Sequence, residues 1–156
     1  MVWVTNHPGL GFPHDVGRTG GRLVRSTFEV TAVLTRIGAE NDLSLTQMRV
    51  LGIVRDRRVR MSDLAAFLGL DKSTLSGLVD RAEKRGLLAR EKSTQDRRVF
   101  DVYPTAAGLQ LTERVYQEIR AALAPSTDHL EPERQERLAE LLEAMMVPWT
   151  GSAQRP

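Results

Sequence analysis

Polar and cationic side chains gather on one side of a short amphipathic segment, residues 71–84. Lys72, Ser73, Ser76 and Arg81 lie on that side, whereas leucine, valine and alanine recur at intervals of three and four on the other. A helix with this pattern buries one stripe and exposes the rest. Ammonium, guanidinium and hydroxyl groups held together on an exposed helix can bind phosphate oxygens and the edges of nucleobases.

A second short helix is predicted before this segment, across a tight turn. Gly69 follows the apolar residues of segment 64–68, where a helix end favours a residue that tolerates positive φ. Asp71 is predicted to cap the next helix, with Leu70 and Leu75 as a hydrophobic staple. The pair is typical of a helix-turn-helix, whose second helix can enter a DNA major groove. The alternative is a compact helical hairpin that does not bind DNA.

A basic hairpin follows the helix pair. Segments 87–92 and 99–103 have strand character, and the polar segment 93–98 between them is too long for a two-residue turn. From Arg81 to Arg98 seven Lys or Arg and three Asp or Glu give a net charge of +4, against +2 for the whole chain. Positive charge is therefore concentrated on a wing that would lie beside a DNA backbone. A solvated hairpin that is basic by chance is the alternative.

The order and spacing of these motifs resemble the MarR family of winged-helix transcriptional regulators. The matching residues are Leu45, Met48, Val50, Leu51 and segments 62–69, 70–76, 78–81, 85–87, 96–98 and 104–108. Together they span residues 43–108. The resemblance implies that the Asp96 carboxylate orients Arg98 in a minor groove. The family often has an arginine where this chain has Gly77, and the glycine would instead let the backbone approach DNA or a neighbouring helix closely.

Cations and hydroxyls of the helix pair, the wing and the connector before them are the candidate DNA contacts. The set is Arg55, Arg60, Lys72, Ser73, Thr74, Ser76, Gly77, Arg81, Arg90, Lys92, Asp96, Arg97 and Arg98. Each has a solvated surface position as its alternative. The basic connector 55–60 is as consistent with a solvated loop as with phosphate contact. Asp80 is expected to pair with Arg81 or Lys84.

Further helices are predicted on both sides of the winged unit, giving a mainly α fold with a small β-wing (α+β). The predicted organisation is a flexible arm (1–15), a dimerisation helix (16–42), the winged helix-turn-helix region (43–104), two C-terminal dimerisation helices (105–148) and a tail (149–156). Ser44 or Thr46 is expected to cap the helix over 44–55, and Thr105 the first C-terminal helix. Pro125 is expected to interrupt or end that helix, and Pro148 to stop the last one.

Apolar stripes on these flanking helices are longer than so small a winged unit can cover. The candidate dimer contacts are Leu23, Val30, Leu138, Leu141, Leu142 and Met145. An uncovered stripe needs a partner, and a two-fold homodimer is the simplest closed solution. The resemblance implies the same dimer. Its recognition helices would lie about 34–36 Å apart, facing the half-sites of a pseudo-palindromic double-stranded DNA.

The resemblance further implies a small, often aromatic or lipophilic effector between the helical and winged parts. Its candidate contacts are Thr31, Thr35, Met48, Leu51 and Tyr116, with ordinary core packing as the alternative. The predicted function is a homodimeric sequence-specific transcriptional regulator, usually a repressor that a ligand releases. The alternative is a winged-helix dimer that serves as a protein-interaction module without operator recognition, an interpretation that Gly77 motivates.

Composition excludes several other classes of function. With 41% hydrophobic and 27% charged residues, the 156-residue chain is typical of one globular domain. It has no cysteine, so disulfides, thiolate metal sites and redox-active thiols are excluded. No catalytic or metal-binding constellation is recognisable, so no enzyme activity, cofactor or metal is predicted. The chain has neither an apolar run of about 18 residues nor a signal-peptide pattern, so a cytoplasmic protein without a membrane partner is expected.

Overall fold

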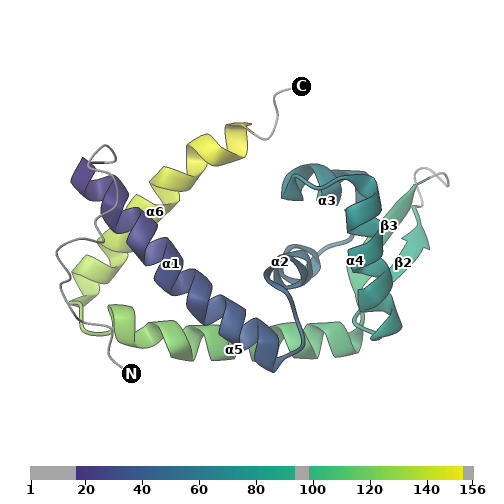
Figure 1. The fold of residues 1–156 in the computed structure, drawn as a ribbon, viewed down its shortest axis with the longest axis horizontal. Coiled ribbons are helices and arrows are strands. Elements are labelled where there is room, and N and C mark those ends of the chain that lie inside the picture. The colour runs from purple at the N-terminus through teal and green to yellow at the C-terminus, as the bar shows by residue number, and fades with distance from the viewer. Residues whose placement is uncertain (1–16, 94–98, 153–156) are drawn as a thin grey trace, which may run out of the picture.

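The computed structural model describes residues 17–93 and 99–152, with side chains through Met145. The elements are α1 (Gly17–Glu40), α2 (Leu45–Val54), β1 (Val59–Arg60), α3 (Met61–Leu68), α4 (Lys72–Lys84), β2 (Leu88–Lys92), β3 (Phe100–Pro104), α5 (Ala106–Thr127) and α6 (Pro132–Ser152). Figure 1 shows the winged unit at one end and the long helices α1, α5 and α6 extending away from it. The predicted mainly α fold with a small β-wing is confirmed.

Helices α3 and α4 form the predicted helix-turn-helix. Gly69 ends α3 in the left-handed conformation (φ 66°), and its N–H donates to the carbonyl of Ala66 at 3.2 Å. Asp71 caps α4, as predicted. The two helices bury Leu64 and Leu75 completely between them and the rest of the core. Burial of this stripe leaves the polar side of α4 outside the core.

The sheet has the strand order β1-β3-β2, with both pairings antiparallel. Val102 of β3 lies opposite Val59 on one side and Arg90 on the other. Strand β1 lies directly before the helix pair and joins it to the wing through its pairing with β3. The central strand buries Val102 against the helix pair, so the wing and the helices share one core.

Side-chain caps begin the helices where the sequence predicts them. Ser44, not Thr46, caps α2: its Oγ accepts from the Gln47 N–H at 3.2 Å while its own N–H donates to Gln47 Oε1 at 2.8 Å. Thr105 caps α5 and accepts from the Gly108 N–H at 3.0 Å. Both caps satisfy backbone donors that a helix start would leave without partners.

Two predicted helix ends were wrong. Pro125 lies inside α5, which continues to Thr127, and α6 passes Pro148 and continues to Ser152. A proline removes one backbone donor, but its fixed φ is close to the helical value, so the remaining turns can form around it.

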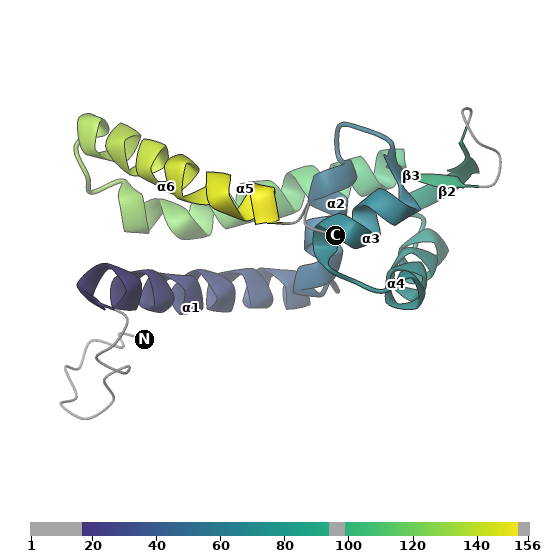
Figure 2. The same cartoon turned by 90° about the horizontal axis from the view of Figure 1, so that it is seen from above.

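Helices α1 and α5 pack against each other, and α6 turns back from the far end of α5 (Figure 1). In the turned view α1 and α6 lie beside the winged unit, α5 continues past α2 towards β3, and none of the three covers α4 (Figure 2). Every side chain of α6 from residue 132 to residue 145 is exposed except that of Gln135, which contacts Leu130 in the preceding turn. None of the helices in the described ranges is both long enough and apolar enough to cross a membrane.

Candidate nucleic-acid interface

The first turn of α4 is organised by Asp71. Its carboxylate accepts from the Thr74 N–H at 2.8 Å, from the Thr74 hydroxyl at 2.6 Å and from the Ser73 hydroxyl at 2.5 Å. These hydrogen bonds, led by that from the Ser73 side chain, hold the pKa of Asp71 well below its usual range. Each hydroxyl has one proton. Ser73 and Thr74 can therefore accept a hydrogen bond from DNA without giving up the cap, but they cannot donate one.

An open groove of about 630 Å³ runs between the helix pair and the wing. Four predicted DNA contacts line it: Lys72, Ser73, Ser76 and Arg90. The remaining lining residues are Met61, Ser62, Leu75, Val99 and Phe100. The structure therefore brings the start of α4 and strand β2 to one concave surface.

The other described candidates on α4 and the wing are not among the residues that line this groove. Arg81 is exposed near the end of α4, and Lys92 is exposed at the end of β2. Among the described residues, a Cβ atom on Gly77 would have only the Arg81 guanidinium near it, at 3.5 Å, so no described neighbouring helix requires the glycine. Asp96, Arg97 and Arg98 lie outside the described residues.

Arg90 connects the wing to the recognition helix. Its guanidinium lies 2.6 Å from Asp80 and 2.6 Å from Glu83, with the side chain only 29% exposed. Burial opposes the charge, but the two carboxylates outweigh it and raise the pKa of Arg90. The expected pairing of Asp80 with Arg81 or Lys84 was wrong, because Asp80 and Glu83 lie three residues apart on α4 and both reach β2. Arg90 thus lies at the groove with its charge already compensated.

The basic connector is largely engaged with the protein itself. The Arg55 guanidinium lies 5.2 Å from the centre of the Tyr116 ring on α5. Arg58 lies 4.1 Å from the centre of the Tyr103 ring and pairs with Glu91. Arg60 lines a separate polar hollow of about 350 Å³ together with Asp63 and Asp101. Arg55 and Arg60 are therefore not among the residues that line the groove.

A larger cavity of about 730 Å³ lies where α1, α2, α3 and α5 meet. Of the five predicted effector contacts, Thr31, Met48, Leu51 and Tyr116 line it, and Thr35 does not. Leucine, isoleucine, valine and methionine form most of the wall, and Phe67 of α3 contributes an aromatic ring that is 59% exposed.

Comparisons with known proteins agree with this geometry. A sequence model of the MarR family matches residues 41–99. YfiV, a helix-turn-helix-type transcriptional regulator from Bacillus subtilis, is 32% identical over 100 residues, which cover 64% of this chain and 62% of YfiV. The structure of AbsC, a MarR family regulator from Streptomyces coelicolor, is 27% identical with a TM-score of 0.67 and covers 86% of this chain and 97% of AbsC. In sequence and in fold, the chain is similar to the MarR family.

A second structure in the comparison contains a ligand. CouR from Rhodococcus jostii RHA1, solved with p-coumaroyl-CoA bound, is 25% identical with a TM-score of 0.71 and covers 84% of this chain and 93% of CouR. The extent of that overlap includes the long helices as well as the winged unit, so this chain has the full MarR fold rather than its DNA-binding part alone.

The predicted dimer contacts are exposed in the single subunit. Leu23 and Val30 on α1 and Leu138, Leu141, Leu142 and Met145 on α6 are between 37% and 53% exposed. The four α6 residues follow one another at intervals of three, one and three and so form a stripe on one side of the helix.

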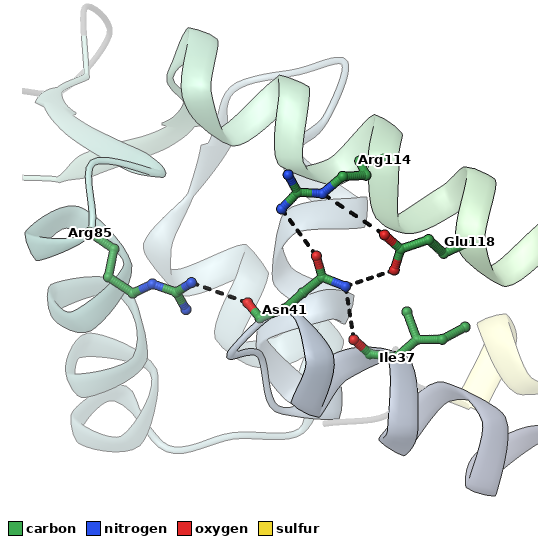
Figure 3. A network of polar contacts seen from close by, with 5 residues as sticks. All are labelled: Ile37, Asn41, Arg85, Arg114 and Glu118. Carbon is green, nitrogen blue, oxygen red and sulfur yellow. Dashed lines mark hydrogen bonds and ion pairs between the residues drawn. The ribbon is translucent and has the colours of Figure 1, made fainter.

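A polar network at the end of α4 was not anticipated from the sequence. Figure 3 shows Asn41, after the end of α1, in contact with Arg114 and Glu118 of α5 and with Arg85 at the end of α4. The asparagine beyond a helix end was the only local signal, because asparagine favours such positions. Its partners on α5 are more than 70 residues away and could not be identified from spacing.

Proposed function

We propose that this chain is a homodimeric, sequence-specific DNA-binding transcriptional regulator, and that it acts as a repressor. The observation that carries the proposal is the groove that Lys72, Ser73 and Ser76 of α4 share with the wing. In this groove, helix α4 presents an ammonium group for phosphate contact and hydroxyl oxygens that can accept hydrogen bonds from base amino groups.

The exposed stripe of α6 supports the dimeric part of the proposal. Leucines and a methionine at 37–53% exposure on one helix face are stabilised when a second copy covers them. A two-fold axis through this helical layer would present two winged units to successive half-sites on one side of a duplex.

Binding to DNA selected from a random pool by the purified dimer tests the proposal. The complex is expected to weaken steeply with salt, because each phosphate contact releases counterions. Lys72→Ala removes one phosphate contact from each subunit, so it should lower affinity roughly threefold to tenfold or more and reduce the salt slope by about two. Arg36→Ala on α1 is the matched control: it removes the same charge from an exposed i,i+4 ion pair outside the groove, and its affinity should not change.

Two results would contradict the proposal. If no sequence is enriched from the pool, or if Lys72→Ala and Arg36→Ala bind DNA equally well, the groove does not bind DNA. Retention of a stable dimer in that case would favour the alternative, a winged-helix protein-interaction module.

We also propose that the cavity between α1, α2, α3 and α5 holds a small aromatic or lipophilic effector. A largely apolar wall with a few polar groups, among them Thr31, Thr112 and Tyr116, is typical of such sites. The p-coumaroyl group in the CouR structure supports an aromatic ligand. Phe67 lies in the wall and belongs to α3, the first helix of the helix-turn-helix. A ligand that binds Phe67 more tightly in one of two arrangements of the helix pair would raise the population of that arrangement.

The effector proposal is tested by thermal unfolding with p-coumaroyl-CoA and a series of small aromatic acids. A binding compound should raise the melting temperature of the wild-type chain and weaken its DNA complex. Thr31→Phe is expected to fill part of the cavity and abolish the shift while DNA binding persists. An equal shift in both chains would place the ligand elsewhere.

A further inference from the structure

We propose that Arg85 and Asn41 are positioning residues for DNA recognition: together they hold the end of recognition helix α4 in a fixed orientation against the dimer-forming helices α1 and α5. The proposal rests on the dimeric, DNA-binding function proposed above. In this proposal the polar network drawn in Figure 3 fixes the distance between the two recognition helices of a dimer.

Arg85 lies at the C-terminal end of α4 and reaches the turn after α1. It is the C-cap residue of α4, and its guanidinium donates to the carbonyl of Asp42 at 2.5 Å and to that of Asn41 at 3.2 Å. Both acceptors are backbone oxygens, so the contact depends on the position of the main chain rather than on a side-chain rotamer. A charged donor makes these hydrogen bonds stronger than neutral ones.

The turn that accepts from Arg85 is itself rigid. Asp42 adopts a left-handed conformation (φ 54°), and the Leu43 N–H donates to the carbonyl of Gly38 at 2.7 Å, which closes the end of α1. A Cβ atom on Gly38 would lie 2.5 Å from the carbonyl oxygen of Leu43, so the glycine permits this closure. The turn can therefore transmit the position of α1 to α4.

Asn41 joins the same turn to α5. Its amide nitrogen donates to the carbonyl of Ile37 at 3.0 Å and to Glu118 at 2.8 Å, and its amide oxygen accepts from Arg114 at 3.1 Å. Both amide protons are used, and the residue is only 9% exposed. A buried amide with this set of partners is costly to rotate or move, because every displacement breaks a hydrogen bond.

Helix α4 packs mainly on α3 and β2 of its own winged unit. Among the described residues, Arg85 connects the end of α4 to the α1–α2 turn by two hydrogen bonds. Loss of this connection would leave the winged unit folded but less firmly oriented. In a dimer, the same angular freedom in each subunit changes the distance between the two recognition helices.

A distance measurement between the two subunits tests the proposal. Because the chain has no cysteine, Lys84→Cys introduces one spin-label site per subunit on α4, and dipolar spectroscopy on the dimer gives the distance between the two labels. The otherwise wild-type chain should give a narrow distribution. Arg85→Ala should broaden or shift it, Arg85→Lys should restore part of the width, and Arg36→Ala on α1 should leave it unchanged.

A second measurement uses the DNA selected by the wild-type dimer, with the half-site spacing lengthened or shortened by a base pair. Arg85→Ala and Asn41→Asp should each lose about tenfold of the preference for the natural spacing, the equivalent of about one charge-assisted hydrogen bond. A purely structural role would lower the melting temperature without changing this preference.

The outcomes separate the two proposals. Absence of any dipolar signal in the wild-type background would overturn the dimer, and absence of enriched DNA would overturn the DNA-binding function. A narrow wild-type distribution that Arg85→Ala leaves unchanged, with the spacing preference intact, would overturn the positioning role alone. Asn41→Asp tests the network from its other side, since it removes both amide donors at constant size and places a carboxylate beside Glu118.

Discussion

Gly108→Ala is expected to destabilise the fold by about 3 kcal/mol, since overpacking at a buried position costs that much when the neighbours cannot move away. A Cβ atom on Gly108 would lie 1.9 Å from the carbonyl oxygen of Leu87 and 2.9 Å from its carbonyl carbon. That carbonyl already accepts from the Thr105 N–H at 3.1 Å, and the Leu87 N–H donates to Ala82 at 2.9 Å. The backbone of Leu87 is therefore held from both sides. Urea unfolding measures the loss as a lower transition midpoint.

Gly77→Ala is the matched control for this substitution. Both glycines lie in helices, so alanine gains the same intrinsic helix propensity at each, about 1 kcal/mol. At Gly77 the added methyl group would meet only the Arg81 side chain at 3.5 Å, an ordinary contact. Gly77→Ala should therefore be neutral or stabilising. Equal stability of the two variants would show that α5 does not approach Leu87 as closely as the structure has it.

Replacing Leu141 and Leu142 together by glutamate is expected to convert the proposed dimer into folded monomers. Burial of a leucine side chain contributes about 1.5–3 kcal/mol, and the two-fold symmetry removes each contact twice. The dimer dissociation constant should rise by roughly a thousandfold or more. Sedimentation at micromolar concentration measures the change. Because both leucines are exposed in the single chain, at 53% and 46%, helix content should be retained.

Leu109→Glu provides the control for the dimer prediction. Leu109 is similarly exposed, at 41%, but lies in the first turn of α5 beside the winged unit rather than on α6. This variant should remain dimeric. If the α6 double variant also sediments as a dimer, the α6 stripe is not the interface. If Leu109→Glu alone dissociates the dimer, the interface lies nearer the winged unit than proposed.

The contacts of Gly108, Arg90 and Arg55 could not be predicted from the sequence, because each joins separate segments of the chain. The segment 104–108 was recognised as part of a family pattern, but the reason for its glycine is the approach of Leu87, some twenty residues earlier. Arg90 and Arg55 were recognised as cations available to phosphates. Their carboxylate and aromatic partners became visible only when the strand and helices were packed together.

The sequence by itself determined the elements and their ends near the recognition helix. Asp71, Ser44 and Thr105 each lie within three residues of the backbone donors that they cap, and Gly69 ends α3 through its own conformation. These signals are local, because a cap and an apolar period act within one or two helical turns. For that reason they identified the helix-turn-helix and the wing without any knowledge of packing.

Only the tertiary structure decided which cations remain available to a ligand and how the recognition helix is held. Asn41 and Glu118 are 77 residues apart, and Arg85 and Asp42 are 43 apart. Such pairs depend on where separate helices cross, and no periodicity along the chain encodes a crossing point. The local pattern therefore specified helix α4, whereas its orientation and its charge partners follow from contacts that form only when separate elements of the fold meet.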